Sequence, residues 1–241
     1  MAWLKIDLHT HTREDHQDRI KYNSYQLIDQ AAQKGFDAIA ITNHNSVFYT
    51  DLLAKYSQKK GILLIPGMEI TLSGNHVLLI NPDFKSNPKK RPLSDLKKIK
   101  NESNLIIAPH PFFPNNKSLR SQFFRYLPYF DAIEFSHCYN RFLNFNIKAA
   151  REAKKNNLPL IGTSDCHFLW EFGTTYSFVD AEKNIPSIIN AVKNGKIRLA
   201  TSPLSIPLLF RLSLSIIQVK IKNLISPIKS HKKISASPGK S

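Results

Sequence analysis

A short apolar stretch that ends in two histidines lies near the start of the chain: Trp3-Leu-Lys-Ile-Asp-Leu-His-Thr-His-Thr12. Residues 3–8 predict a buried strand. Alternate side chains of a strand point to the same face, so His9 and His11 can bind one ion together. The chain has nine histidines, and one His-x-His pair among so many arises easily by chance. Its meaning therefore depends on the rest of the sequence.

Short apolar runs alternate with helical stretches along most of the chain. Further strands are predicted over 36–42, 61–65, 76–80, 104–108, 131–136 and 158–163. Helices are predicted over 24–34, 47–60, 144–156 and 186–195. This alternation predicts an α/β fold whose parallel sheet is covered on both faces. The number of strands favours a barrel over an open sheet.

The composition excludes several classes of protein. Of the 241 residues, 42% are hydrophobic, which is enough for a core and excludes disorder throughout. The two cysteines, Cys138 and Cys166, exclude a disulfide scaffold and favour a reducing, cytoplasmic setting. The sequence shows no signal-peptide pattern and no stretch long and apolar enough to span a membrane.

The net charge of +16 is concentrated in the last quarter of the chain. Residues 1–182 carry +5, and the remainder carries +11 without a single acidic residue. We expect an α/β barrel domain over 1–200, an amphipathic basic segment over 201–228 and a disordered tail over 229–241. The basic segment has two interpretations: it packs on the barrel, or it is an interfacial helix held by an anionic membrane. Its lysines would also suit contact with nucleic acid.

Imidazole and carboxylate side chains follow one predicted strand after another. They are His44, Glu69, His110, His137, and the pair Asp165 and His167. The carboxyl ends of parallel barrel strands meet at one mouth, where active sites form. Nitrogen and oxygen ligands suit zinc, manganese or iron(II). A structural zinc site needs only four ligands, often cysteines, so about eight candidates with little thiol predict a catalytic cluster of two or three ions.

Taken together, these motifs resemble the PHP family, the polymerase and histidinol phosphatase domain. The matching segments are His9-x-His11-Thr12, Thr42-Asn-His44-Asn45, Gly67-Met-Glu69-Ile-Thr71, Ala108-Pro-His110-Pro111 and Gly162-Thr-Ser-Asp165-Cys-His167. They occur in the family's order and span residues 1 to 180. The resemblance implies a distorted (β/α)7 TIM-like barrel with a trinuclear metal centre at its mouth. It also implies hydrolysis of phosphoesters.

The resemblance implies three metal sites. The first would use His9, His11, Glu69 and Asp165; the second would use the bridging Glu69, His110 and His137; the third would use His16, His44 and His167. Two segments depart from the pattern. Asn43 stands where Asp is usual, which removes a carboxylate beside the third site. The segment around His137 is variable in the family, so Cys138 or Asn140 could supply that contact instead.

The chemistry of phosphate esters is consistent with such a cluster. Two ions can share a hydroxide, hold it in line with phosphorus and neutralise developing charge. Glu69 would fix the separation of the ions, and Asp165 would orient the hydroxide. A third ion would hold another phosphate oxygen or the leaving group; otherwise His167 or His44 would protonate the leaving oxygen. Arg141 is the first candidate for a phosphate clamp, since its planar fork matches phosphate oxygens; Arg13, Lys21 and Lys117 are weaker candidates.

Three functions are consistent with these features. The first is metal-dependent hydrolysis of a phosphomonoester, either a small phosphorylated metabolite or a nucleotide. The second is an exonuclease that acts on short single-stranded oligonucleotides with the same cluster. The third is a non-catalytic or membrane-associated PHP module, to which only Asn43 points directly. Outside the motifs, His76 is expected to be structural, and Cys166 is not expected to be a nucleophile.

Overall fold

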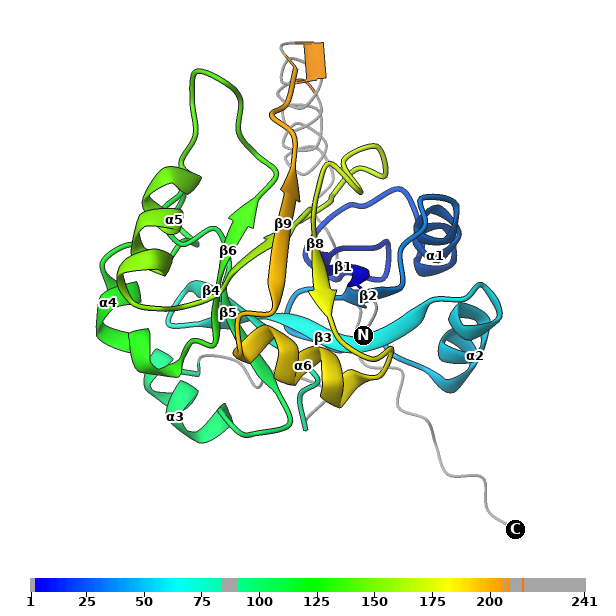
Figure 1. Ribbon diagram of the computed structural model, residues 1–241, viewed down its shortest axis with the longest axis horizontal. Coiled ribbons are helices and arrows are strands. Elements are labelled where there is room, and N and C mark those ends of the chain that lie inside the picture. The colour runs from blue at the N-terminus through cyan, green and yellow to red at the C-terminus, as the bar shows by residue number, and fades with distance from the viewer. Residues whose placement is uncertain (1–2, 84–90, 206, 209–213, 215–241) are drawn as a thin grey trace.

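In the computed structural model, which describes residues 3–83, 91–205, 207–208 and 214, the chain forms one strongly curved sheet with helices around it (Figure 1). The sheet order is β7-β6-β5-β4-β3-β2-β1-β8-β9. The strands are β1 (Trp3–Thr10), β2 (Ala38–Ile41), β3 (Leu63–Leu72), β4 (Asn75–Ile80), β5 (Leu105–Ala108), β6 (Ala132–Ser136), β7 (Leu160–Thr163), β8 (Thr175–Asp180) and β9 (Ile197–Thr201).

The sheet closes almost completely on itself where β7 meets β8. The Gly162 amide donates a hydrogen bond to Ser177 Oγ at 2.8 Å, and Ser177 Oγ donates to the Gly162 carbonyl at 3.1 Å. A Cβ atom on Gly162 would lie 2.2 Å from Leu199 Cδ1 and 2.6 Å from the Tyr176 carbonyl oxygen. Only glycine permits this approach. The predicted fold class, a distorted TIM-like α/β barrel, is therefore confirmed.

The sheet is less regular than the predicted parallel one. Neighbouring strands are parallel over β1-β2-β3 and β5-β6-β7, but β4 runs antiparallel to both of its neighbours, and so does β8. Strand β3 continues to Leu72 and turns back into β4 through Ser73 and Gly74, whose φ angles are +48° and +84°. Glu69 therefore lies inside a strand, not after its end. Strands β8 and β9 were not predicted.

All four predicted helices are present, as α1 (Ser24–Gln33), α2 (Asp51–Lys59), α5 (Asn146–Lys155) and α6 (Ile185–Lys193). Two short helices, α3 (Leu96–Ile99) and α4 (Gln122–Tyr126), were not predicted. Asn23 caps α1, and Asn184 caps α6 just before Pro186 in its first turn. Helix α2 begins at Asp51 and not at Val47, because the Thr50 side chain accepts a hydrogen bond from the Leu53 amide.

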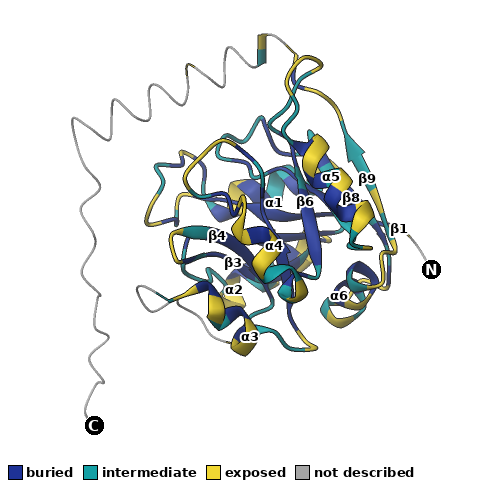
Figure 2. Ribbon diagram, turned by 90° about the vertical axis from the view of Figure 1, so that its left-hand side faces the viewer, coloured by how far each residue is buried: buried dark blue, intermediate teal, exposed yellow. Residues whose placement is uncertain are grey.

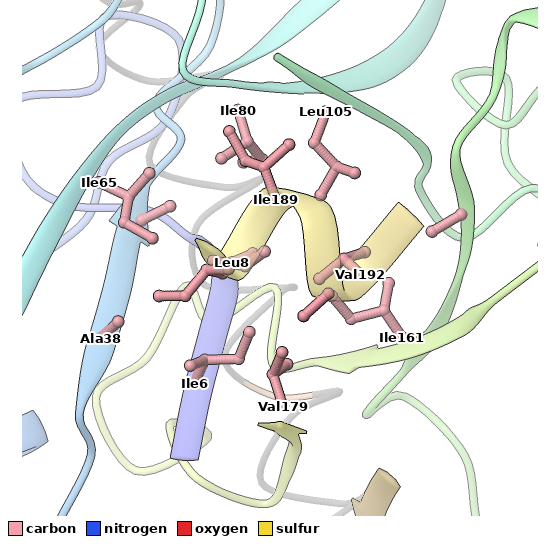
Figure 3. Packing of buried hydrophobic residues seen from close by; sticks show 14 of the residues in the cluster. Ile6, Leu8, Ala38, Ile65, Ile80, Leu105, Ile161, Val179, Ile189 and Val192 are labelled. Atoms are coloured by element: carbon pink, nitrogen blue, oxygen red, sulfur yellow. The ribbon is translucent and has the colours of Figure 1, made fainter. Parts of the chain in front are cut away.

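An apolar core fills the barrel and ends where the polar site begins. Leu4, Ile6 and Leu8 of β1 pack with inner residues of the other strands, and α6 covers them with Ile189 and Val192 (Figure 3). Inner positions closer to the carboxyl ends of the strands are polar, among them Glu69 of β3 and Glu134 of β6, both fully buried. The core therefore supports a layer of buried charge at the mouth of the barrel.

The chain beyond β9 is described only in part. Leu204 is buried, and its amide donates to the Tyr139 carbonyl at 2.9 Å. The predicted amphipathic segment over 201–228 lies largely outside the described residues, and the predicted tail over 229–241 lies wholly outside them. Within the described part of the chain, none of the helices has the length and apolar character needed to cross a membrane.

Candidate metal centre

An irregularity in β1 accompanies the inward position of His9. Leu4, Ile6 and Leu8 belong to the inner cluster, so strict alternation would place His9 on the opposite face. The pairing of β1 with β2 shifts register between Asp7 and Thr10, as in a β-bulge. His9 instead contacts Glu134 of β6 and Glu69 of β3. The shift in register therefore accounts for His9 joining the inner polar layer.

Glu69 is the centre of this polar layer. Its carboxylate is 2% exposed and lies within 3.7 Å of five imidazoles. The distances from its oxygens are 3.7 Å to His9 Nε2, 3.5 Å to His11 Nε2, 3.0 Å to His44 Nε2, 2.8 Å to His76 Nδ1 and 3.3 Å to His110 Nε2. A buried carboxylate is stable only with hydrogen bonds or cations around it. This one has several potential cation ligands beside it.

Four of these imidazoles have a hydrogen-bond partner at Nδ1; for His44 it is Asp15 Oδ2, at 2.8 Å. His9 Nδ1 lies 2.7 Å from Glu134 Oε1, and His11 Nδ1 lies 3.1 Å from Asp15 Oδ2. His110 Nδ1 lies 3.2 Å from Ser118 Oγ, whose hydroxyl donates to the His110 carbonyl. With the ring proton on Nδ1, each ring directs the lone pair of Nε2 toward Glu69. Metal-binding histidines are oriented in the same way in proteins.

The Nε2 atoms of His9 and His11 converge closely. They lie 3.1 Å apart, and Asp165 Oδ1 lies 3.2 Å from the first and 3.4 Å from the second. Two such lone pairs repel each other unless a proton or a metal ion lies beside them. Without metal, burial lowers the pKa of His9, but the charges of Asp165, Glu134 and Glu69 outweigh burial and hold the pKa well above its usual value. These groups are therefore stable together only when a proton or a metal ion supplies positive charge.

Four sets of three side chains in the described part of the chain could each hold a metal ion. They are His9, His11 and Glu69; His11, Asp15 and His44; His11, Asp165 and His167; and His44, Glu69 and His76. In each set the candidate ligand atoms lie within 4.8 Å of one another. Nitrogen and oxygen donors of this kind suit zinc, manganese and iron. The residues therefore fit the predicted metal ions, while their number and identity stay predictions.

The predicted third site contains two aspartates that were not predicted. Asp15 Oδ2 lies 2.8 Å from His44 Nδ1, and Asp18 Oδ2 lies 3.1 Å from His167 Nε2. Asp18 and Asp165 outweigh the effect of burial and raise the pKa of His167 to about 10. His16, the predicted ligand in this segment, is exposed and belongs to none of the four sets.

His137 lies apart from the central cluster. It is buried, and neither ring nitrogen has a hydrogen-bond partner among the described residues. Its Nε2 lies 3.7 Å from Glu171 Oε1, and the residue belongs to none of the four sets. Burial raises the pKa of the neighbouring Cys138 thiol to about 11. The Asn140 side chain accepts hydrogen bonds from the Phe142 and Leu143 amides. The ligand role of His137 remains a prediction.

Comparison with known families assigns the chain. The model described as PHP domain matches residues 7–162, more than half of the chain, and the one described as PHP-associated matches residues 144–197. The chain belongs to the PHP domain family. Its barrel is the PHP-like metal-dependent phosphoesterase fold, and its His, Glu and Asp clusters lie at the mouth of that barrel.

Three individual relatives illustrate the match. An uncharacterized protein of Methanocaldococcus jannaschii, MJ1587, is 29% identical over 149 residues, which is 57% of this chain and 84% of the relative. A two-domain protein from Bacteroides vulgatus, containing a predicted PHP-like metal-dependent phosphoesterase, has a TM-score of 0.67 at 23% identity and covers 89% and 70% of the two chains. A lesion-specific endonuclease from Pyrococcus furiosus has a TM-score of 0.57 at 16% identity and covers 89% and 66%.

Asn43, the departure from the usual PHP aspartate, contacts Thr12, two residues after the end of β1. It is buried, its Oδ1 accepts from the Thr12 amide at 2.9 Å, and its Nδ2 donates to Thr12 Oγ1 at 3.0 Å. An aspartate would accept the same amide hydrogen bond. The carboxamide therefore fixes the residue that follows His11, and Asp15 supplies a carboxylate beside His44.

A cavity of about 370 Å³ opens over the candidate metal ligands of this PHP domain. Glu69, His44, His110, Asp165 and His167 all line it. Of the described residues that line it, Lys117 is the only lysine or arginine, whereas Arg141, the predicted phosphate clamp, is exposed and does not line it. His76, expected to be structural, also lines it, and its Nε2 is buried without a partner among the described residues.

Proposed function

We propose that this PHP domain hydrolyses a phosphomonoester with two or three divalent ions, zinc, manganese or iron. The observation that supports this most directly is the convergence of several imidazoles on the buried carboxylate of Glu69 and the partly exposed carboxylate of Asp165. Bound ions would supply Lewis acidity, lower the pKa of a water molecule and neutralise charge on the phosphoryl group. In this proposal His9, His11, His44, His110, Glu69, Asp165 and His167 hold the ions, and His16 and His137 remain candidates.

Residues of the chain would provide the rest of the reaction. Lys117 lines the cavity and would hold phosphate oxygens by its charge. With only two ions bound, His167 would be free of metal; its side chain is 35% exposed and hydrogen-bonded to Asp18, so it would then be placed to give a proton to the leaving oxygen. Asp165 has a φ of +44°, and its carboxylate faces both His9 and His11. It would orient the attacking water while binding metal.

The size of the cavity favours a small substrate. A volume of about 370 Å³ lies at the small end of the usual range for ligand pockets, about 300–1,000 Å³. A phosphorylated metabolite or a mononucleotide would fit such a cavity. The alternative is a nuclease, and the fold shared with endonuclease Q and the net charge of +16 support it. In that case the phosphodiester would reach the cavity from a strand lying across the mouth.

Phosphate release from a substrate panel tests the proposal. Protein reloaded with manganese or zinc would be offered small phosphomonoesters, nucleotides and short oligonucleotides, with a His9→Ala/Glu69→Ala variant as the control. We expect release from a small phosphomonoester, abolished in the variant. Activity confined to oligonucleotides would favour the nuclease. No activity with any metal, despite bound ions, would refute hydrolysis and favour the non-catalytic module.

A further inference from the structure

Helices α4 and α5, with the loop between β6 and α5, form one continuous outer face. The Lys148 ammonium of α5 lies 4.6 Å from the centroid of the Phe112 ring and 5.6 Å from that of the Phe124 ring of α4. Figure 2 views the molecule toward these two helices, which carry exposed residues on their outer sides. We call this surface the α4–α5 face. It comprises the exposed residues among 124–125, 141–143 and 147–155.

The α4–α5 face is cationic without compensating acids. Its exposed cations are Arg125, Arg141, Lys148, Arg151, Lys154 and Lys155. None of the three acidic residues between residues 118 and 157 offsets this positive charge. Glu134 and Glu152 are buried, and Asp131 forms an ion pair with Lys100 at 3.0 Å. Among the residues that the structure describes, no acid forms an ion pair with any of the six cations. The face therefore attracts anions.

Large apolar side chains stand among these charges. Phe142 is 88% exposed, Ile147 58%, Leu143 55% and Phe124 46%. Single exposed apolar residues are common on soluble proteins, but four on one face mark an interaction surface. Two of them, Phe142 and Leu143, are adjacent in the loop that follows β6 at the mouth of the barrel.

We infer that the α4–α5 face binds an anionic lipid surface. Lysine and arginine beside exposed phenylalanine and leucine make up the composition of interfacial membrane contacts. Leu143 and Ile147 are aliphatic and cannot stack on nucleic-acid bases, so the face fits lipid better than a single strand. Binding in this way would hold the mouth of the barrel beside the membrane. The inference does not depend on the proposed hydrolysis.

Leu204, which follows β9, contacts the loop that belongs to this face. The Leu204 amide is bonded to the Tyr139 carbonyl, three residues before Phe142. The basic sequence that follows residue 205 therefore starts close to the loop.

Vesicle binding by the full chain tests this inference. Vesicles of phosphatidylcholine alone would be compared with vesicles of equal parts phosphatidylcholine and phosphatidylglycerol in a sedimentation assay. The test variants are Phe142→Ser/Leu143→Ser and Lys154→Glu/Lys155→Glu. The matched controls are Leu52→Ser and Lys55→Glu/Lys59→Glu on α2, which lies on the opposite side of the barrel in Figure 1 and also exposes these residues. Circular dichroism would confirm that each variant folds.

We expect the wild-type chain to bind the anionic vesicles and not the neutral ones. Each test variant should weaken binding by about tenfold or more, and the two α2 controls should bind like the wild type. Equal losses in the test and control variants would show that only net charge matters and would overturn the inference. So would wild-type binding by both test variants, or binding of short oligonucleotides without binding of vesicles.

Discussion

The substitution Glu134→Gln tests whether hydrogen bonds to Nδ1 orient the imidazoles for metal binding through Nε2. Glu134 is fully buried. Its Oε1 lies 2.7 Å from His9 Nδ1 and also accepts from the Thr163 hydroxyl, while its Oε2 accepts from the His110 amide at 2.6 Å. Glutamine has the same shape but replaces one of these oxygens with an NH2 group. At least one buried donor then faces another donor.

The expected magnitude follows from these contacts. An unsatisfied buried donor costs about 1–3 kcal/mol, so the metal-free variant should lose about that much free energy of unfolding. Loss of an outer partner of a metal-binding histidine weakens metal affinity by about 10–100-fold. Since each tenfold change corresponds to about 1.4 kcal/mol, this loss is about 1.4–2.8 kcal/mol.

Two assays would measure these effects separately. Urea unfolding of the metal-free protein gives the change in stability, and competition with a chromophoric chelator gives the affinity for manganese or zinc. Glu152→Gln is the matched control, because Glu152 is also buried but lies on α5, where its carboxylate contacts Asn156. Wild-type metal affinity in Glu134→Gln would refute the view that Glu134 orients His9 for metal binding.

Three further predictions follow from the site and the fold. Lys117→Ala should lower kcat/KM for a phosphomonoester by about tenfold or more. If Arg141→Ala causes that loss and Lys117→Ala does not, Arg141 binds the phosphate, as predicted from the sequence. The pKa values of His9 and His167 in the folded protein lie above the ordinary 6.5, that of His167 at about 10. The stability that these two protonated side chains contribute is therefore complete below pH 6.5 and is lost as the pH rises. Thermal melts of the metal-free protein should show a Tm that falls above pH 6.5 and rises more on adding metal; a Tm that does not change with pH would contradict this. Gly162→Ala, whose Cβ would lie 2.2 Å from Leu199 Cδ1, should destabilise the barrel by about 1–3 kcal/mol in urea unfolding, and unchanged stability would show that β7 and β8 can separate freely.

Much of the site could be predicted because parallel strands place their carboxyl ends together. Spacing along the chain was enough to bring His9, His11, His44 and His110 to one mouth with Glu69. The same rule does not apply to residues that come from an antiparallel strand. His76 comes from β4, which returns alongside β3 as a hairpin, and hydrophobic periodicity does not reveal which strand pairs with which.

Glu134 and Asp15, whose carboxylates contact the histidine Nδ1 atoms, were not predicted for a different reason. Glu134 stands in the apolar run Ala132-Ile-Glu-Phe135, and a carboxylate in a buried strand has to be paired. The sequence alone therefore indicates that Glu134 has a buried partner. Asp15 and His16 are adjacent in an irregular loop, where no periodicity decides which of two neighbouring side chains points inward. The structure buries Asp15 and exposes His16.

The most direct test of metal-dependent hydrolysis measures metal binding and phosphate release in the same sample. Chelator-stripped protein would be titrated with manganese or zinc, while bound ions per chain and phosphate release from a small phosphomonoester are measured together. We expect no release from stripped protein and release that rises as two or three ions bind, with neither binding nor release restored in Glu69→Gln. Full activity in stripped protein, or saturating metal without hydrolysis of any substrate, would contradict it.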